Sequence, residues 1–175
     1  MKFVILVFVS LFFTTHLSAR QLNISPGTTT VSGISSGAFF AHQMHISFSE
    51  KIKGAALFAG GPFYCSQGNV FRALNVCMAS KDEVHTAEMS LEKIIQQEGA
   101  GLIDSISNIQ RSSVFVLGGL SDPVVKQEVV DELVRLYLLL GVSNLEYVNQ
   151  LNIGHAIPTN GYGNPCQTGG ESPFI

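Results

Sequence analysis

The clearest structural pattern in the chain is TTTVSGISSGAFFAHQMHISF, Thr28–Phe48. Its first half is short and rich in β-branched residues, which is typical of a buried strand. Its second half carries large apolar side chains at every fourth position, the spacing of one helix face: Phe40, Met44 and Phe48. Between the halves stands the pattern G-x-S-x-G, centred on Ser35. This pattern predicts a nucleophile elbow, a sharp strand-to-helix turn that raises a serine hydroxyl above the edge of a sheet.

Three later apolar runs, each followed by turn residues, predict strands at 54–59, 113–117 and 145–151. Two amphipathic runs predict helices at 83–98 and 124–140. Short apolar strands that alternate with helices indicate a parallel sheet covered on both faces. We therefore expect an α/β protein with a three-layer, α/β-hydrolase-like fold and a mostly parallel sheet.

Two further polar residues follow predicted strands. Asp122 comes after the strand at 113–117, and His155 comes after the strand at 145–151. Because the loops after parallel strands meet at one edge of the sheet, we expect both side chains to lie near Ser35. The order Ser, Asp, His is that of the catalytic triad in α/β-hydrolases.

This pattern predicts acyl transfer from an ester. His155 takes the proton of Ser35 as the serine attacks a carbonyl, and Asp122 orients the imidazole. The backbone N–H of Ser36 stabilises the oxyanion, and an acyl-enzyme forms and is hydrolysed. The alternatives are structural: Ser35 in a glycine turn, Asp122 as a turn-capping residue before Pro123, and His155 as an ordinary loop residue.

The other carboxylates that we considered are weaker candidates for the acid. Asp82 and Glu83 are expected at the start of the helix at 83–98, where the helix dipole favours negative charge. Asp104 lies in a polar stretch before Ser105. Asp122 alone follows a strong predicted strand directly.

The remaining histidines do not indicate a metal site. His42 and His45 are spaced i, i+3 on the first predicted helix and could in principle bind a metal. No third ligand is evident, so we expect both on a surface face of the helix. His85 is expected in a charged helix start, and His16 lies in the N-terminal apolar segment. We expect neither a metal nor a cofactor.

The first residues resemble a secretory signal peptide. A basic start at Lys2 is followed by an apolar run at 3–13, and Leu17-Ser18-Ala19 offers small residues for cleavage after Ala19. The run is too short for a membrane anchor, which needs about 20 apolar residues. We expect residues 1–19 to be removed and residues 20–175 to form one exported catalytic domain that does not remain in the membrane.

The charge of the chain excludes one class of partner. The net charge is −3, and it becomes −4 when the single positive charge of Lys2 is removed. A mildly acidic chain lacks the basic surface that nucleic-acid binding requires. We therefore expect no nucleic-acid partner, and the sequence predicts no oligomeric state.

Three cysteines fit an oxidising compartment. Cys65 and Cys77 are twelve residues apart in the segment 62–81, which is expected to be a loop, so they are the natural disulfide pair. Cys166 is left over, which suggests a partner outside this chain, with a buried free thiol as the alternative.

Six segments carry a resemblance to a known family. They are Gly33–Phe39 (GISSGAF), Gln43–His45, Phe58–Cys65 (FAGGPFYC), Gly154–Thr159 (GHAIPT), Asn164–Cys166 and Ser172–Ile175. The chain resembles the extracellular polyhydroxybutyrate (PHB) depolymerases, which are short-chain polyester esterases of the α/β-hydrolase superfamily. The resemblance implies that Ser35 is the nucleophile, His155 the base and Asp122 the acid.

The resemblance also implies a circularly permuted sheet, in which the serine comes early in the chain. Members of the family continue past the segment Ser172–Ile175, and their later half supplies more strands and a second oxyanion donor. We therefore expect this chain to be an incomplete, C-terminally truncated form of the fold.

Three hypotheses about function remain open at this point. The first is a secreted esterase for poly- or oligo-(3-hydroxybutyrate), and the second is a feruloyl or acetyl esterase acting on polysaccharide. The third is a catalytically inactive fragment or a module that binds polyester surfaces. The elbow pattern alone does not separate them.

Overall fold

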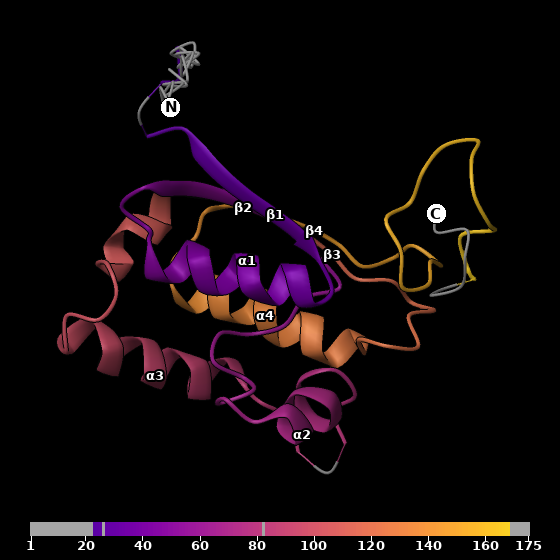
Figure 1. The fold of residues 1–175 in the computed structure, drawn as a ribbon, viewed down its shortest axis with the longest axis horizontal. Helices are drawn as coiled ribbons and strands as arrows, with labels where there is room; N and C mark the ends of the chain where they lie inside the picture. Colours follow the sequence, from indigo (N-terminus) through magenta and orange to yellow (C-terminus); the bar gives the residue numbers. More distant parts are fainter. Residues whose placement is uncertain (1–22, 26, 82, 169–175) are drawn as a thin grey trace, which may run out of the picture.

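The structure is a computed structural model that describes residues 23–25, 27–81 and 83–168 (Figure 1). Four strands form one sheet in the order β1-β2-β3-β4, and every neighbouring pair is parallel. Their bounds are β1 (Thr29–Ile34), β2 (Ile52–Phe58), β3 (Ser113–Leu117) and β4 (Asn144–Val148). All four predicted strands are confirmed, although β4 ends three residues earlier than expected.

Three long helices connect consecutive strands: α1 (Ser36–Ser47), α3 (Ala87–Gly99) and α4 (Gln127–Leu139). Each connection moves one strand further in the same direction across the sheet. Because parallel crossovers are right-handed, this order puts all three helices on the same face, as Figure 1 shows. The expected α/β fold is thus present, but the described residues place helices on only one face of the sheet.

The strand register shows which side chains face these helices. One row across the sheet is Gly33, Leu57, Val116 and Tyr147, and Leu57 and Val116 are fully buried. The rows on either side of it point to the opposite face, where Phe58 of one row and Phe115 of the other lie with their ring centroids 5.7 Å apart. The helix-covered face therefore holds the core.

Helix α4 packs its predicted apolar side into this core. All six residues expected to face inward are buried: Val129, Val130, Leu133, Leu136, Tyr137 and Leu140. Helix α1 differs from the expectation. Phe40 and Phe48 are mainly exposed, and the buried face carries smaller or polar side chains: Ala38, Ala41, His42, His45 and Ile46. Small residues suit this face because α1 contacts both β1 and β2.

The segment that follows β2 is more regular than the predicted loop. It contains the short helix α2 (Val70–Arg72) and the π-helical turn η1 (Ala73–Cys77). Helix α3 starts later than expected, because Thr86 is its N-cap and accepts a hydrogen bond from the N–H of Met89. A 3₁₀ turn, η2 (Ile106–Arg111), precedes β3.

Three parts of the sequence analysis fall outside the described residues: the signal peptide at 1–19, the place of Asp82 at a helix start and the matched segment Ser172–Ile175. Within the described residues, no helix combines the length and the apolar character that a membrane crossing requires.

Candidate active site

Ser35 stands at a strained turn between β1 and α1. Its backbone has φ 56° and ψ −126°, in the positive-φ region that residues other than glycine rarely adopt. The turn is tight, because a Cβ atom on Gly33 would lie 2.3 Å from the carbonyl carbon of Gly37. The first glycine of G-x-S-x-G therefore lets the strand and helix approach closely. A strained residue in a tight strand-to-helix turn is the local geometry that a nucleophile elbow requires.

The ends of the strands are aligned at the edge where Ser35 lies. The register places Ile34, Phe58, Leu117 and Val148 in one row. Backbone hydrogen bonds continue just past this row, from Ser35 N–H to Phe58 O and from Gly118 N–H to Val148 O. The loops after β1, β3 and β4 therefore emerge at the same edge of the sheet, as the sequence predicted.

Asp122 is held rigidly in the loop after β3. Its side chain is 1% exposed, and Oδ1 accepts hydrogen bonds from the N–H groups of Val124 and Val125 at 2.8 and 2.9 Å. Its second carboxylate oxygen, Oδ2, lies 2.8 Å from Nδ1 of His155. The carboxylate thus directs the Nδ1 proton of the imidazole toward itself and leaves Nε2 for other chemistry.

The loop that carries His155 is attached to the Asp122 loop through the backbone. The N–H of Ser121 donates to Ile153 O at 3.1 Å, and the N–H of Leu120 donates to Leu151 O at 3.0 Å. Gly119 packs against Ile153 so closely that a Cβ atom would lie 2.3 Å from its carbonyl oxygen. Contacts between the two loops therefore set the Asp122–His155 geometry.

The structure brings two of the three predicted residues into contact. Asp122 and His155 are hydrogen-bonded, while Ser35 shares their edge of the sheet. Among the hydrogen bonds of the described residues, none joins Ser35 to His155.

A pocket of about 420 Å³ opens beside Ser35 and Ser36. Helix α1 forms one side with Phe39, Phe40 and Gln43, and the segment after β2 forms the other. Most of the lining side chains are apolar, which suits an acyl or alkyl group. The first N–H groups of α1 lie at the Ser35 end, where helix N–H groups have no carbonyl partner within the helix. Sequence reasoning did not find this pocket, because its wall comes from a segment expected to be a loop.

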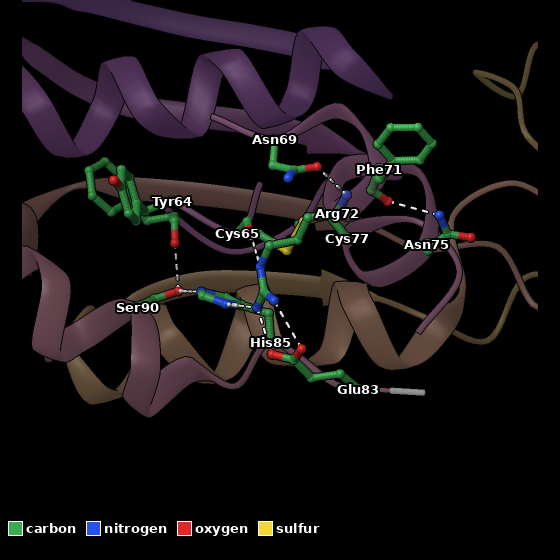
Figure 2. Close-up of a disulfide and its surroundings, with 12 residues drawn as sticks. Tyr64, Cys65, Asn69, Phe71, Arg72, Asn75, Cys77, Glu83, His85 and Ser90 are labelled. Carbon is green, nitrogen blue, oxygen red and sulfur yellow. Dashed lines mark hydrogen bonds and ion pairs between the residues drawn. A yellow bond between two sulfur atoms is a disulfide. The ribbon is translucent and has the colours of Figure 1, made fainter. Parts of the chain in front are cut away.

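A disulfide joins Cys65 and Cys77, as expected, with a Cα–Cα distance of 5.8 Å. Both cysteines line the pocket. Figure 2 shows Arg72 beside this bond: its Nε donates to Cys65 O at 2.8 Å, and its guanidinium binds the carboxylate of Glu83 through two nitrogens. The side-chain hydrogen bond to Glu83 raises the pKa of Arg72. Glu83 is thus the partner of Arg72 rather than a helix-start residue.

The expectation of surface histidines on α1 is wrong. His42 and His45 have no exposed surface. Nδ1 of His42 lies 3.1 Å from Gly61 O, and His45 lies between the hydroxyl groups of Tyr137 and Ser112. Burial lowers the pKa of His42 to about 3 and that of His45 to about 4, so both rings are neutral at pH 7. They are polar members of the core.

His85 also differs from the expectation. It precedes α3, is 4% exposed, and contacts Ser90 Oγ through Nε2 at 2.9 Å (Figure 2). Burial lowers its pKa. Among the residues that the structure describes, no group of three or more His, Cys, Asp or Glu side chains could hold a metal ion. The thiol of Cys166 is free and partly exposed.

Comparison with curated proteins finds related enzymes. The chain is 39% identical over 156 residues to a poly(3-hydroxybutyrate) depolymerase of Delftia acidovorans, covering 88% of this chain and 31% of that protein. It is 27% identical to a polyhydroxybutyrate depolymerase of Talaromyces funiculosus, covering 87% of this chain and 44% of that protein. The chain thus spans less than half the length of these curated relatives. No family model matches the sequence.

Solved structures give the same result. The crystal structure of PHB depolymerase from Penicillium funiculosum matches with a TM-score of 0.75 and 26% identity. A serine-to-alanine variant of a PHB depolymerase, complexed with an R3HB trimer, matches equally well. Each match covers 87% of this chain and 48% of the solved chain. The sheet and helices described above are therefore those of an α/β-hydrolase-like fold.

Proposed function

The chain belongs to the polyhydroxybutyrate depolymerase family, and on that premise we propose that it is a secreted serine esterase for poly- or oligo-(3-hydroxybutyrate) esters. Ser35 is the nucleophile, His155 the general base and Asp122 the residue that orients the base. The observation that carries the proposal is the hydrogen-bonded Asp122–His155 pair at the sheet edge that also holds the strained Ser35 turn.

The proposed reaction uses each group for one task. Nε2 of His155 takes the proton from Ser35 Oγ as the oxygen attacks the ester carbonyl carbon. The backbone N–H of Ser36 donates to the resulting oxyanion. When the C–O bond to the alcohol breaks, the imidazolium returns its proton to the leaving oxygen, and an acyl-enzyme remains. Water, deprotonated by His155, then releases the acid and restores Ser35.

The choice of substrate rests on the relatives and on the pocket. One related solved structure is a PHB depolymerase complexed with an R3HB trimer. The apolar pocket at Ser35 in this chain accommodates a small acyl group. Export fits the Cys65–Cys77 disulfide, because disulfides persist in oxidising compartments, and it fits the signal-like residues 1–19.

The test is hydrolysis of a 3-hydroxybutyrate trimer by the purified chain, followed by titration of the released acid. We expect Ser35→Ala to lose at least about a thousandfold in rate, because the acyl-enzyme can no longer form. Ser32→Ala is the matched control, since Ser32 is an exposed residue of β1 on the face without helices. Equal rates in the two variants would refute the assignment.

A further inference from the structure

Tyr64 lies between two hollows on the surface. It lines the 420 Å³ pocket beside Ser35, and it also lines a second hollow of about 420 Å³ between the disulfide segment and α3. The second hollow is polar, with Glu92, Lys93 and Gln96 of α3 on one side. Tyr64 is the residue that the two hollows share, so its side chain stands where one could open into the other.

The position of Tyr64 is fixed by contacts on both sides. Its backbone N–H donates to Oε1 of Gln43, a residue of α1 that lines the first pocket. The ammonium group of Lys93 lies 4.7 Å from the centre of the Tyr64 ring, in a cation–π contact on the side of the second hollow. The backbone of Tyr64 has a φ of 59°, which is unfavourable for a residue other than glycine. The surrounding contacts must therefore stabilise this conformation.

The pocket beside Ser35 suits the acyl part of an ester. The leaving oxygen has to come within hydrogen-bond reach of His155, because His155 returns the proton to it. His155 does not line the pocket, whereas Ser35 and Ser36 do. The group that stays attached to the serine therefore extends into the pocket, toward Tyr64.

We propose that Tyr64, held by Lys93, is the end wall of the acyl pocket and limits the length of the acyl chain. This inference rests on the proposed function, because it takes Ser35 as the site of acyl attachment. Removal of the phenol ring connects the apolar pocket to the space beyond it. A longer acyl chain can then extend into the space beyond residue 64, which the ring of Tyr64 blocks in the native protein.

The experiment measures binding rather than turnover. All variants carry Ser35→Ala, so that the esters stay intact, and the dissociation constants of p-nitrophenyl butanoate and hexanoate are measured by calorimetry. We expect Tyr64→Ala to raise the ratio of hexanoate to butanoate affinity about a hundredfold, because hexanoate carries two more methylenes and each discriminates by about tenfold in an apolar pocket. Tyr64→Phe keeps the ring and its contact with Lys93, so its ratio should match that of the native residue.

The outcomes separate the two proposals. An unchanged ratio in Tyr64→Ala would contradict the proposal that Tyr64 closes the end of the acyl pocket. The absence of binding of either ester to any variant would contradict it too. Tyr64→Leu, which keeps apolar bulk in the segment, should give an intermediate ratio and serves if Tyr64→Ala does not fold. Absence of hydrolysis by the chain with Ser35 intact contradicts the proposed function, while the ratio still decides the role of Tyr64.

Discussion

Asp122 Oδ2 lies 2.8 Å from His155 Nδ1, although 33 residues separate the two along the chain. The contact exists because the loops after β3 and β4 emerge side by side and share backbone hydrogen bonds. Oδ1 of the same carboxylate accepts two backbone N–H groups, so the carboxylate has little freedom to turn away. The contact fixes the orientation of the imidazole and leaves Nε2 outside this hydrogen bond.

The first prediction concerns this contact. Asp122→Asn should lower kcat by about 10⁴, because the amide no longer favours the tautomer with Nδ1 protonated. Asp104→Asn is the control: Asp104 accepts from the N–H of Glu50 and makes no contact with His155. Steady-state hydrolysis of a soluble hydroxybutyrate ester measures both. A similar loss in the two variants would mean that the effect is not specific to the Asp122–His155 pair.

The second prediction concerns the turn at Ser35. Gly33→Ala should lower the free energy of unfolding by about 3 kcal/mol, because its Cβ would overlap the backbone of Gly37. Gly37→Ala is the matched change, since a Cβ there meets nothing within 4 Å and alanine favours the helix. Urea unfolding curves compare them. Equal stabilities would show that the strand and helix are not packed as closely as described.

The third prediction concerns the disulfide. Replacing both Cys65 and Cys77 with serine should cost about 3 kcal/mol of unfolding free energy, because the unfolded chain loses a short closed loop. Cys166→Ser should change stability by less than about 0.5 kcal/mol, since its thiol forms no disulfide here. Guanidinium unfolding without reductant gives both values. No difference between the two variants would contradict a stabilising Cys65–Cys77 bond.

The fourth prediction concerns pH. Burial lowers the pKa of His42 to about 3 and of His45 to about 4, whereas both titrate near 6.5 in the unfolded chain. Below pH 6.5 the unfolded state therefore binds more protons than the folded state, and stability falls as the pH falls toward these lowered values. Each histidine should cost about 2 kcal/mol between pH 7 and pH 5.

His42→Leu tests this directly by urea unfolding at the two pH values. The variant should lose about 2 kcal/mol less than the native chain between pH 7 and pH 5. An identical pH dependence of the native chain and His42→Leu would show that His42 is not buried in its neutral form.

Much of the fold follows from local sequence patterns. The strands and α4 were predicted correctly. A short apolar run between turn residues is compatible with few structures other than a strand, and a regular helical stripe with few other than a helix. The helix stripe Phe40, Met44 and Phe48 was misleading. Helix α1 crosses two strands at close range, so small residues and two histidines pack against the sheet, and Phe40 lines the pocket instead.

The sequence predicted less of the site's surroundings. The Asp122–His155 contact could be predicted from the sequence, because strand order alone brings the two loops to one edge of the sheet. The ion pair of Arg72 with Glu83 was not, since it depends on how the disulfide segment folds back on the residues before α3. Burial of His42 and His45 also depends on distant partners, namely Gly61, Ser112 and Tyr137. No local spacing indicates such contacts.

In the proposed reaction Ser35, His155 and Asp122 act as one unit. The most direct measurement is the rate and site of labelling by a fluorophosphonate, read by mass spectrometry of the intact chain and its peptides. The adduct should form on Ser35, and His155→Ala should slow it by about a thousandfold or more, because the serine then lacks its base. An adduct on another residue, or an unchanged labelling rate in His155→Ala, would contradict the account.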